Sequence, residues 1–140
     1  MPPEAIALDI VTPDRRLVAT PVDEVVLPGS EGSLGVLPGH APLLTALSVG
    51  ELMYRRGQER HYVALAWGFA EVLPDRVIVL AEIAERGEEI DRPRAEQARD
   101  RALQLLKGRD ADTDFKRAQL SLQKAIIRLQ AAAHARGEGS

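Results

Sequence analysis

The stretch that decides the fold is residues 77–95, which have the sequence VIVLAEIAERGEEIDRPRA. The first five of them, Val77–Ala81, form a short, β-branched run typical of a buried strand. The last five contain Asp91, a natural helix N-cap, and Pro93, a residue that helices tolerate in their first turn. The chain therefore changes from strands to helices near Arg86.

The part before Arg86 consists of short runs rich in β-branched residues and leucine, separated by turns rich in proline and glycine. Strands spaced by roughly 8–12 residues are typical of an antiparallel sandwich or barrel. A parallel sheet would need helices between its strands, and the runs leave no room for them. The runs are Ile6–Val11, Arg16–Thr20, Glu24–Leu27, Leu34–Leu37, Leu43–Leu47, Glu51–Arg55, His61–Leu65, Phe69–Leu73 and Val77–Ala81.

The part after Arg86 has the period of two helices. In the first, which Gly108 is placed to end, one face carries Ala95, Ala98, Ala102 and Leu106. Caps for the second come from Asp110, Asp112, Thr113 and Asp114. Its seam consists of Phe115, Ala118, Leu122, Ala125, Leu129 and Ala132. The predicted class is mainly β plus α: a β-sandwich domain over residues 1–86, followed by an antiparallel two-helix hairpin over residues 87–140.

The seam of this hairpin is rich in alanine. Each alanine buries little more than one methyl group, worth about 0.8 kcal/mol. Helices of this length depend on packing for their stability. We therefore expect the hairpin to detach more readily than one held by leucines.

Composition restricts the classes of function. With 140 residues, 45% hydrophobic and 28% charged, the chain is long enough for one small globular domain with an appendage. It has no cysteine, which excludes disulfides and thiolate chemistry. No apolar run approaches the roughly 20 residues that span a bilayer, and the first residues lack the pattern of a signal peptide. We expect any membrane association to pass through another protein.

Charge is distributed unevenly along the chain. The net charge is −3, composed of −5 up to Arg86 and +2 from Gly87 onward. The hairpin is therefore the part suited to an anion or an acidic partner. An acidic chain with 4% aromatic residues is not expected to bind nucleic acid.

No pattern of catalytic residues is evident. The run Gly29–Gly35 lacks the Gly-Lys-Ser/Thr ending of a phosphate loop and is predicted to be a hairpin turn. His40, His61 and His134 lie far apart without metal-ligand spacing, and no serine sits in a nucleophile elbow. We expect no metal, no required cofactor and no catalytic activity.

Basic residues of the second part leave two interpretations open. They can form a solvated helix face, with acidic neighbours at helical spacing, or a site for an anion or an acidic partner. They are Arg94, Arg99, Arg101, Lys116, Arg117, Lys124 and Arg128.

The run Val36–Leu47, VLPGHAPLLTAL, resembles the best signature of the epsilon subunits of F-type ATP synthases. Further stretches in the same order resemble other parts of that family, so the similarity covers nearly the whole chain. They are Val25–Gly32, Gly50–Leu52, Gly68–Val72, Val79–Glu82 and Asp114–Ala118.

The resemblance implies a ten-stranded sandwich that packs on the gamma subunit and rests on the membrane-embedded c-ring through Glu31, Gly39 and His40. It implies a peripheral protein on the cytoplasmic face of the cell membrane, in a complex that couples proton flow to ATP synthesis. The hairpin would lie against the sandwich or extend toward the catalytic beta and alpha subunits and hinder ATP hydrolysis. Its beta-subunit contacts would come from Lys116, Arg117, Lys124 and Arg128.

The run Ile90–Ala95, IDRPRA, resembles the motif of epsilon subunits that bind ATP as a regulatory ligand. The matching positions are Glu85, Asp91, Arg94, Arg101, Lys124 and Arg128. Lys124 stands where the binding members carry arginine, whose planar fork a lysine does not reproduce. Asp91 also has a purely structural interpretation as a helix cap.

Two other classes of function stay open at this level. One is a free-standing β-sandwich that binds an unrelated partner, and the other is an enzyme, which would need a polar pocket. Co-purification with gamma and the catalytic subunits distinguishes the rotor subunit from both.

Overall fold

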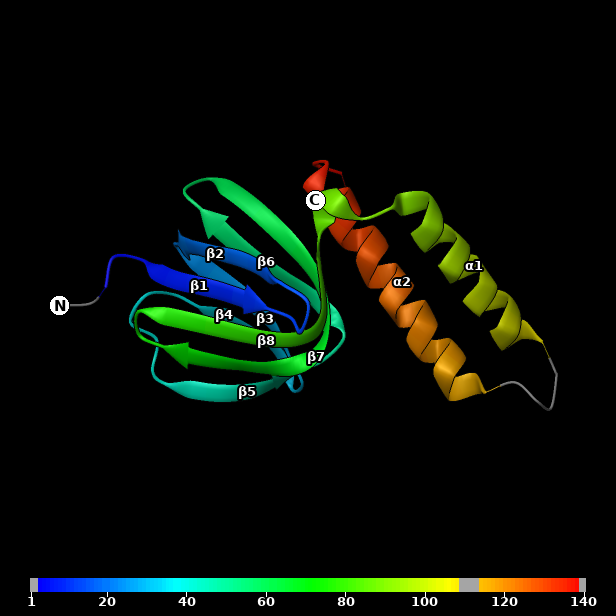
Figure 1. Ribbon diagram of the computed structural model, residues 1–140, viewed down its shortest axis with the longest axis horizontal. Helices are drawn as coiled ribbons and strands as arrows, with labels where there is room; N and C mark the ends of the chain where they lie inside the picture. Colours follow the sequence, from blue (N-terminus) through cyan, green and yellow to red (C-terminus); the bar gives the residue numbers. More distant parts are fainter. Residues whose placement is uncertain (1–2, 109–113, 139–140) are drawn as a thin grey trace.

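A computed structural model of the chain describes residues 3–108 and 114–138. In this part of the chain, eight strands precede one 3-10 turn and two helices, and the helices lie side by side at one end of the strands (Figure 1). The elements are β1 (Ile6–Val11), β2 (Arg16–Val22), β3 (Glu24–Gly29), β4 (Gly32–Val36), β5 (Leu43–Leu47), β6 (Gly50–Arg56), β7 (Glu59–Leu73), β8 (Arg76–Arg86), η1 (Gly87–Glu89), α1 (Arg92–Lys107) and α2 (Phe115–Ala135).

The strands form one folded sheet in the order β2-β1-β8-β7-β5-β3-β4, while β6 bridges β3 and β7. All pairs are antiparallel except β1 with β8, where Leu8 faces Val77 in a parallel register. The sequence predicted an antiparallel sandwich and was wrong at this one pair. The two strands come from opposite ends of the domain, so a long connection can bring them together in the same direction.

Strand β7 explains why eight strands are found where the sequence predicted nine runs, one fewer than the ten that the resemblance implied. The two runs expected around His61 and Phe69 are halves of a single 15-residue strand. Its first half pairs with β6, from Gly50 opposite Leu65 onward, and its second half pairs with β5. The strand thus changes neighbours without interruption, as strands do at the corner of a sandwich.

The corner lies at Trp67 and Gly68. Before it, Val63 and Leu65 face the core, whereas after it Ala70 and Val72 do, so the inward-facing parity changes by one residue. Trp67 has a positive φ of 55°, and it is the only non-glycine residue with a positive φ in the part of the chain that the structure describes. Gly68 is required because a Cβ there would lie 1.9 Å from the Leu80 carbonyl oxygen, and its φ is 139°.

The sandwich has one core of large aliphatic side chains. The largest of them lie fully buried along seven of the eight strands, from Ile6 and Leu8 at the start to Val77 and Val79 at the end. Successive residues of a strand point to opposite faces, and these side chains lie on the inward face.

Both helices begin at the aspartates that the sequence offered. The Asp91 carboxylate accepts the Arg94 backbone N–H at 3.1 Å, and Asp114 accepts that of Arg117 at the same distance. Gly108 caps the end of α1. The other expected caps, Asp110, Asp112 and Thr113, lie outside the described residues.

Only the second half of α2 lies against the sandwich, and α1 packs on the far side of α2 (Figure 1). A small cluster joins hairpin and sandwich through Ala64, Ile90, Ala95, Ala131 and Ala132. The cluster is separate from the sandwich core, so the hairpin is an attachment to a domain that has its own interior.

Candidate functional site

The seat of α2 is the outward face of β6, β7 and β8 near the corner. Before the corner, the even-numbered residues of β7 point outward, and Tyr62 and Ala64 pack against the helix. Gly87 lets the helix approach the backbone, because a Cβ there would lie 2.3 Å from the Ala131 carbonyl oxygen and 2.9 Å from the Ala135 Cβ. Small residues on both sides therefore place α2 directly on the sheet.

An ion pair holds the middle of α2 to β8. Arg128 donates from Nε to Glu85 Oε1 at 2.7 Å and from Nη2 to Oε2 at 3.2 Å, the two-pronged geometry that arginine makes with a carboxylate. Both side chains are half-buried. Two residues that the ATP-binding motif grouped together are thus in contact, although they are 43 positions apart in the chain.

Lys124, one turn before Arg128, contacts the corner of β7. Its ammonium lies 5.3 Å from the centre of the Trp67 ring, within the range of a cation–π interaction. The unusual backbone of Trp67 and this contact belong together, because the corner re-aims the indole toward α2.

A second polar contact lies at the end of α2. His134 Nδ1 is 2.8 Å from Glu51 Oε2, the His134 ring lies 4.6 Å from the Tyr62 ring, and Gln130 also donates to Glu51 at 3.3 Å. No local pattern in the sequence predicts this cluster. Only the facing register of Glu51 and Ala64, together with the position of α2, would have predicted it.

Two shallow grooves gather the basic residues, one between the helices and β8 and one between the two helices. The first, of about 420 Å³, is lined by Glu85, Arg94, Lys124 and Arg128. The second, of about 470 Å³, is lined by Arg94, Arg101 and Arg128. Five of the six residues that matched the ATP-binding motif therefore meet here, whereas Asp91 lines neither groove and caps α1.

The four basic residues assigned to a beta-subunit contact fall into two pairs. Lys116 and Arg117 are exposed on the half of α2 that leaves the sandwich. Lys124 and Arg128 are engaged by Trp67 and Glu85. All four can face a common partner only after α2 has left its seat.

The three residues assigned to the c-ring do not come together. Glu31 is exposed in the turn before β4, and Gly39 and His40 lie in the turn after it. The Gly39 N–H bonds to the Pro74 carbonyl oxygen at 2.7 Å, which ties the second turn to the β7–β8 connection. The two turns therefore lie at opposite ends of one strand.

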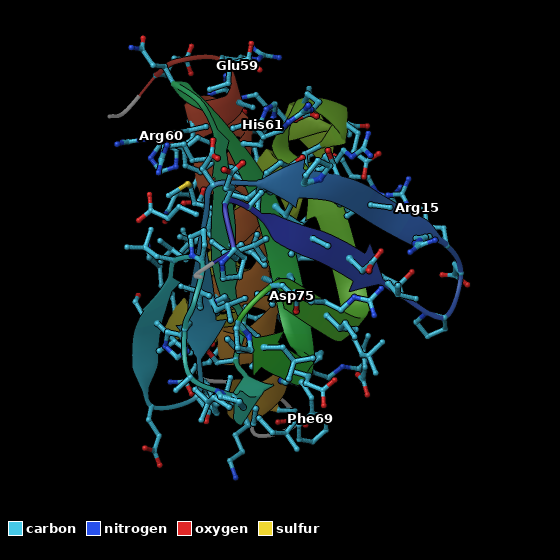
Figure 2. The ribbon with its side chains drawn as sticks, turned by 90° about the vertical axis from the view of Figure 1, so that its left-hand side faces the viewer. Arg15, Glu59, Arg60, His61, Phe69 and Asp75 are labelled. Atoms are coloured by element: carbon cyan, nitrogen blue, oxygen red, sulfur yellow. The ribbon has the colours of Figure 1, made fainter. Side chains whose placement is uncertain are left out.

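Large apolar side chains are exposed on the sheet beyond the corner. Phe69 and Leu80 face each other across β7 and β8 and are 57% and 55% exposed, and Leu44 on β5 is 68% exposed. Figure 2 shows Phe69 at the opposite end of the sandwich from Glu59, Arg60 and His61. Neighbouring apolar residues at the surface mark a protein-binding face.

Within the described residues, no group of three or more His, Asp or Glu side chains is arranged to hold a metal ion. No helix in the described ranges has the length and apolarity needed to cross a membrane.

Two family models together match nearly the whole chain. The "ATP synthase, Delta/Epsilon chain, beta-sandwich domain" matches residues 5–87, and the "ATP synthase, Delta/Epsilon chain, long alpha-helix domain" matches residues 88–133. The two matches meet within η1.

Curated relatives and solved structures give the same result. The ATP synthase epsilon chain of Syntrophobacter fumaroxidans is 50% identical over 92% of this chain and 96% of its own length. That of Koribacter versatilis is 54% identical over 74% of this chain and 72% of its own. A chain in the Euglena gracilis mitochondrial ATP synthase, in a structure of OSCP, F1 and c-ring, is 26% identical with a TM-score of 0.79, covering 93% of this chain and 82% of that one.

Proposed function

The chain belongs to the ATP synthase delta/epsilon chain family, and from this premise we propose that its hairpin alternates between the seat on the sandwich and an extended position that slows ATP hydrolysis. The function is that of an ATP synthase epsilon subunit, a component of the central stalk. The expected resemblance is thereby confirmed. Proton transport and ATP synthesis are activities of the complex.

The subunit is non-catalytic, and it acts through the position of its hairpin in the complex. It sits in a membrane-associated complex on the cytoplasmic side, reaching the membrane through its partners. In support of this role, polar side chains connect elements of the fold, as in the contacts of Glu85 with Arg128 and of Glu51 with His134.

The observation that carries the regulatory proposal is the division of α2. One half is docked through alanines, the Glu85–Arg128 ion pair and the Glu51–His134 contact, and the other half exposes Lys116 and Arg117. A weak seat and an exposed basic surface are what a switching element requires. The extended hairpin then offers all four basic residues to an acidic surface of the catalytic beta subunit, next to alpha.

Deleting residues 112–140 tests this function. In the reconstituted complex, ATP hydrolysis should rise while most coupling to the ion gradient stays. A finer version replaces Lys116 and Arg117 by alanine, with the exposed pair Arg56 and Arg60 on the sandwich as the matched control. Equal hydrolysis in the deleted and intact complexes, at several nucleotide concentrations, would show that the hairpin does not inhibit here.

The exposed face around Phe69 and Leu80 is the docking surface for gamma. This face is apolar and belongs to the sheet. It lies beyond the corner of β7, so gamma bound there would not cover the seat of α2. Leu80→Lys should weaken association with gamma, whereas Glu59→Lys at the opposite end should not. The c-ring contact is assigned to the Glu31 turn, beside which the exposed Leu44 lies. Gly39 and His40, at the other end of β4, would then serve a separate contact.

ATP binds in the grooves between α1, α2 and β8 as a regulatory ligand. Arg94, Arg101 and Arg128 converge there, and phosphate oxygens would compete with Glu85 for the Arg128 guanidinium. Bound ATP would hold both helices and oppose extension, by about 1.4 kcal/mol at tenfold above Kd. Because Lys124 is held by Trp67, we assign it a smaller share of the phosphate contact than the arginines.

Calorimetric titration of the pure protein with ATP, with and without magnesium, tests this site. Arg94→Ala should weaken binding more than Arg99→Ala, because Arg99 pairs with Asp100 and lines neither groove. If titration with millimolar ATP gives no heat, the motif around Asp91 does not bind ATP here and serves only to begin α1.

A further inference from the structure

The short turn η1 is the only link in the described chain between the sandwich and α1. Within it, Glu89 accepts the Arg86 backbone N–H at 2.9 Å, and its two carboxylate oxygens accept from both terminal nitrogens of Arg15, one of them at 3.2 Å. Arg15 lies 74 positions earlier, in the turn between β1 and β2, so this contact ties the start of the sandwich to its end.

The turn that carries Arg15 is itself held in place. The Thr12 side-chain oxygen accepts the Arg15 backbone N–H at 3.2 Å, and the Thr12 N–H bonds back to the Arg15 carbonyl oxygen at 2.9 Å. On the other side of η1, the Arg86 guanidinium donates to the Leu17 carbonyl oxygen. Figure 2 shows Arg15 at the outer end of the β1–β2 hairpin, away from the other labelled residues. Both ends of η1 are therefore bonded to the same hairpin.

The pKa of Glu89 agrees with this geometry. Burial of the carboxylate acts to raise the pKa, but the hydrogen bonds from Arg15 and from the Arg86 amide outweigh it and lower the pKa below its ordinary value of 4.5. The same contact raises the pKa of Arg15. The carboxylate is thus stabilised in its charged form by the sandwich.

The attachment changes at the next residue. The Ile90 side chain is buried among Ala95, Ala131 and Ala132 of the hairpin, with Ala64 of the sandwich beneath them. Asp91 caps α1. Ile90 and Asp91 both have extended backbone, with ψ of 130° and 97°, so rotation there would leave the hydrogen bonds of η1 intact.

We propose that Arg15 and Glu89 form a clasp that keeps η1 on the sandwich when the hairpin undocks, so that the pivot of the hairpin is Ile90–Asp91. This inference rests on the proposed exchange between docked and extended hairpin and adds its hinge. The β1–β2 turn is then a positioning element: it fixes the point from which α1 departs.

Native-state hydrogen exchange of the full chain tests the clasp. The Arg86 and Ile90 N–H groups report on η1, because one bonds to Glu89 and the other to the Gly87 carbonyl oxygen at 3.4 Å. Both amides should open with the sandwich amides and not with those of α1 and α2. Arg15→Gln should speed their exchange by about two- to fivefold, the range expected for a largely exposed pair.

Arg16→Gln is the matched control, because Arg16 neighbours Arg15 but pairs with Asp9. It should leave η1 exchange unchanged. The clasp is refuted if both η1 amides open together with α1 in the unmodified chain, or if the two variants behave alike. Neither result bears on inhibition, which the hairpin deletion measures in the reconstituted complex.

Discussion

The sandwich interior and the seat of α2 are buried to the same degree but are built differently. Leu52 in the core and Ala131 in the seat are both 0% exposed. A leucine, however, removes three more carbon groups from water than an alanine, at about 0.8 kcal/mol each. Complete burial therefore does not imply strong attachment. The sandwich has a core of large side chains, whereas the hairpin is attached to it mainly through alanines.

Two polar contacts accompany the thin apolar seat. The Glu85–Arg128 and Glu51–His134 pairs lie where α2 meets the sheet, and each demands a specific geometry. Half-buried ion pairs add little net stability but select one arrangement over others. The seat thus specifies where the hairpin docks more than how tightly.

The largest expected effect is in the sandwich. Leu52→Ala should lower the free energy of unfolding by about 2–5 kcal/mol, because it leaves a cavity in a closed core. Thermal unfolding followed by circular dichroism measures it, with the exposed Leu44→Ala as control, expected within about 0.5 kcal/mol. A small loss at Leu52 would contradict the distinction between core and seat.

The next effect separates docking from folding. Gly87→Ala should push α2 from its seat, at about 1–3 kcal/mol, since its Cβ would overlap the Ala131 carbonyl oxygen. Trp67 is the only tryptophan, so its emission should change while the sandwich still melts cooperatively. Gly35→Ala, where nothing lies within 4 Å of an added Cβ, is the control. Loss of the sandwich transition in Gly87→Ala would show that hairpin and sandwich fold as one unit.

A smaller effect concerns the ion pair of the seat. Glu85→Gln and Arg128→Gln should each weaken docking by about 1 kcal/mol. In the double variant the losses should not add, because both remove the same contact. Docking is followed by Trp67 emission in denaturant. Strict additivity would mean that the pair does not form in solution.

The smallest effect is that of acid on η1. The folded pKa of Glu89 lies below 4.5, so its stabilisation is complete above that pH and is lost as the pH falls through the folded pKa. NMR of the Glu89 carboxyl carbon should give a pKa below 4.5 in the unmodified chain. In Arg15→Gln, this pKa should rise. In Arg16→Gln, the pKa of Glu89 should stay unchanged. An equal rise of this pKa in both variants would assign the effect to net charge.

The sequence was sufficient for the main architecture because its signals were local. The change of period near Arg86 and the caps Asp91 and Asp114 depend on neighbouring residues alone. The single strand β7 could not be recognised, because Gly68 resembles a turn residue unless the Leu80 backbone beside it is known. The parallel pairing of β1 with β8 is equally non-local.

The candidate site was predictable where a family motif covered it. The motif grouped Glu85, Arg94 and Arg128 before their contacts were known, and the structure brings them to one groove. It contained no sign of Trp67 as the neighbour of Lys124, or of Glu51 as the neighbour of His134. Such pairs depend on which turn of α2 rests on which strand, which is a property of packing.

The parallel pairing of β1 with β8 sets the order in which the molecule is made. Because Leu8 must wait for Val77, the sheet cannot close until nearly all of the sandwich has been synthesised. Contacts so distant in sequence also make closure a slow step of folding. The helices are translated last, when the strands that form their seat are already complete. A ribosome that releases this chain N-terminus first therefore completes the strands of the sandwich before the helices that rest on them.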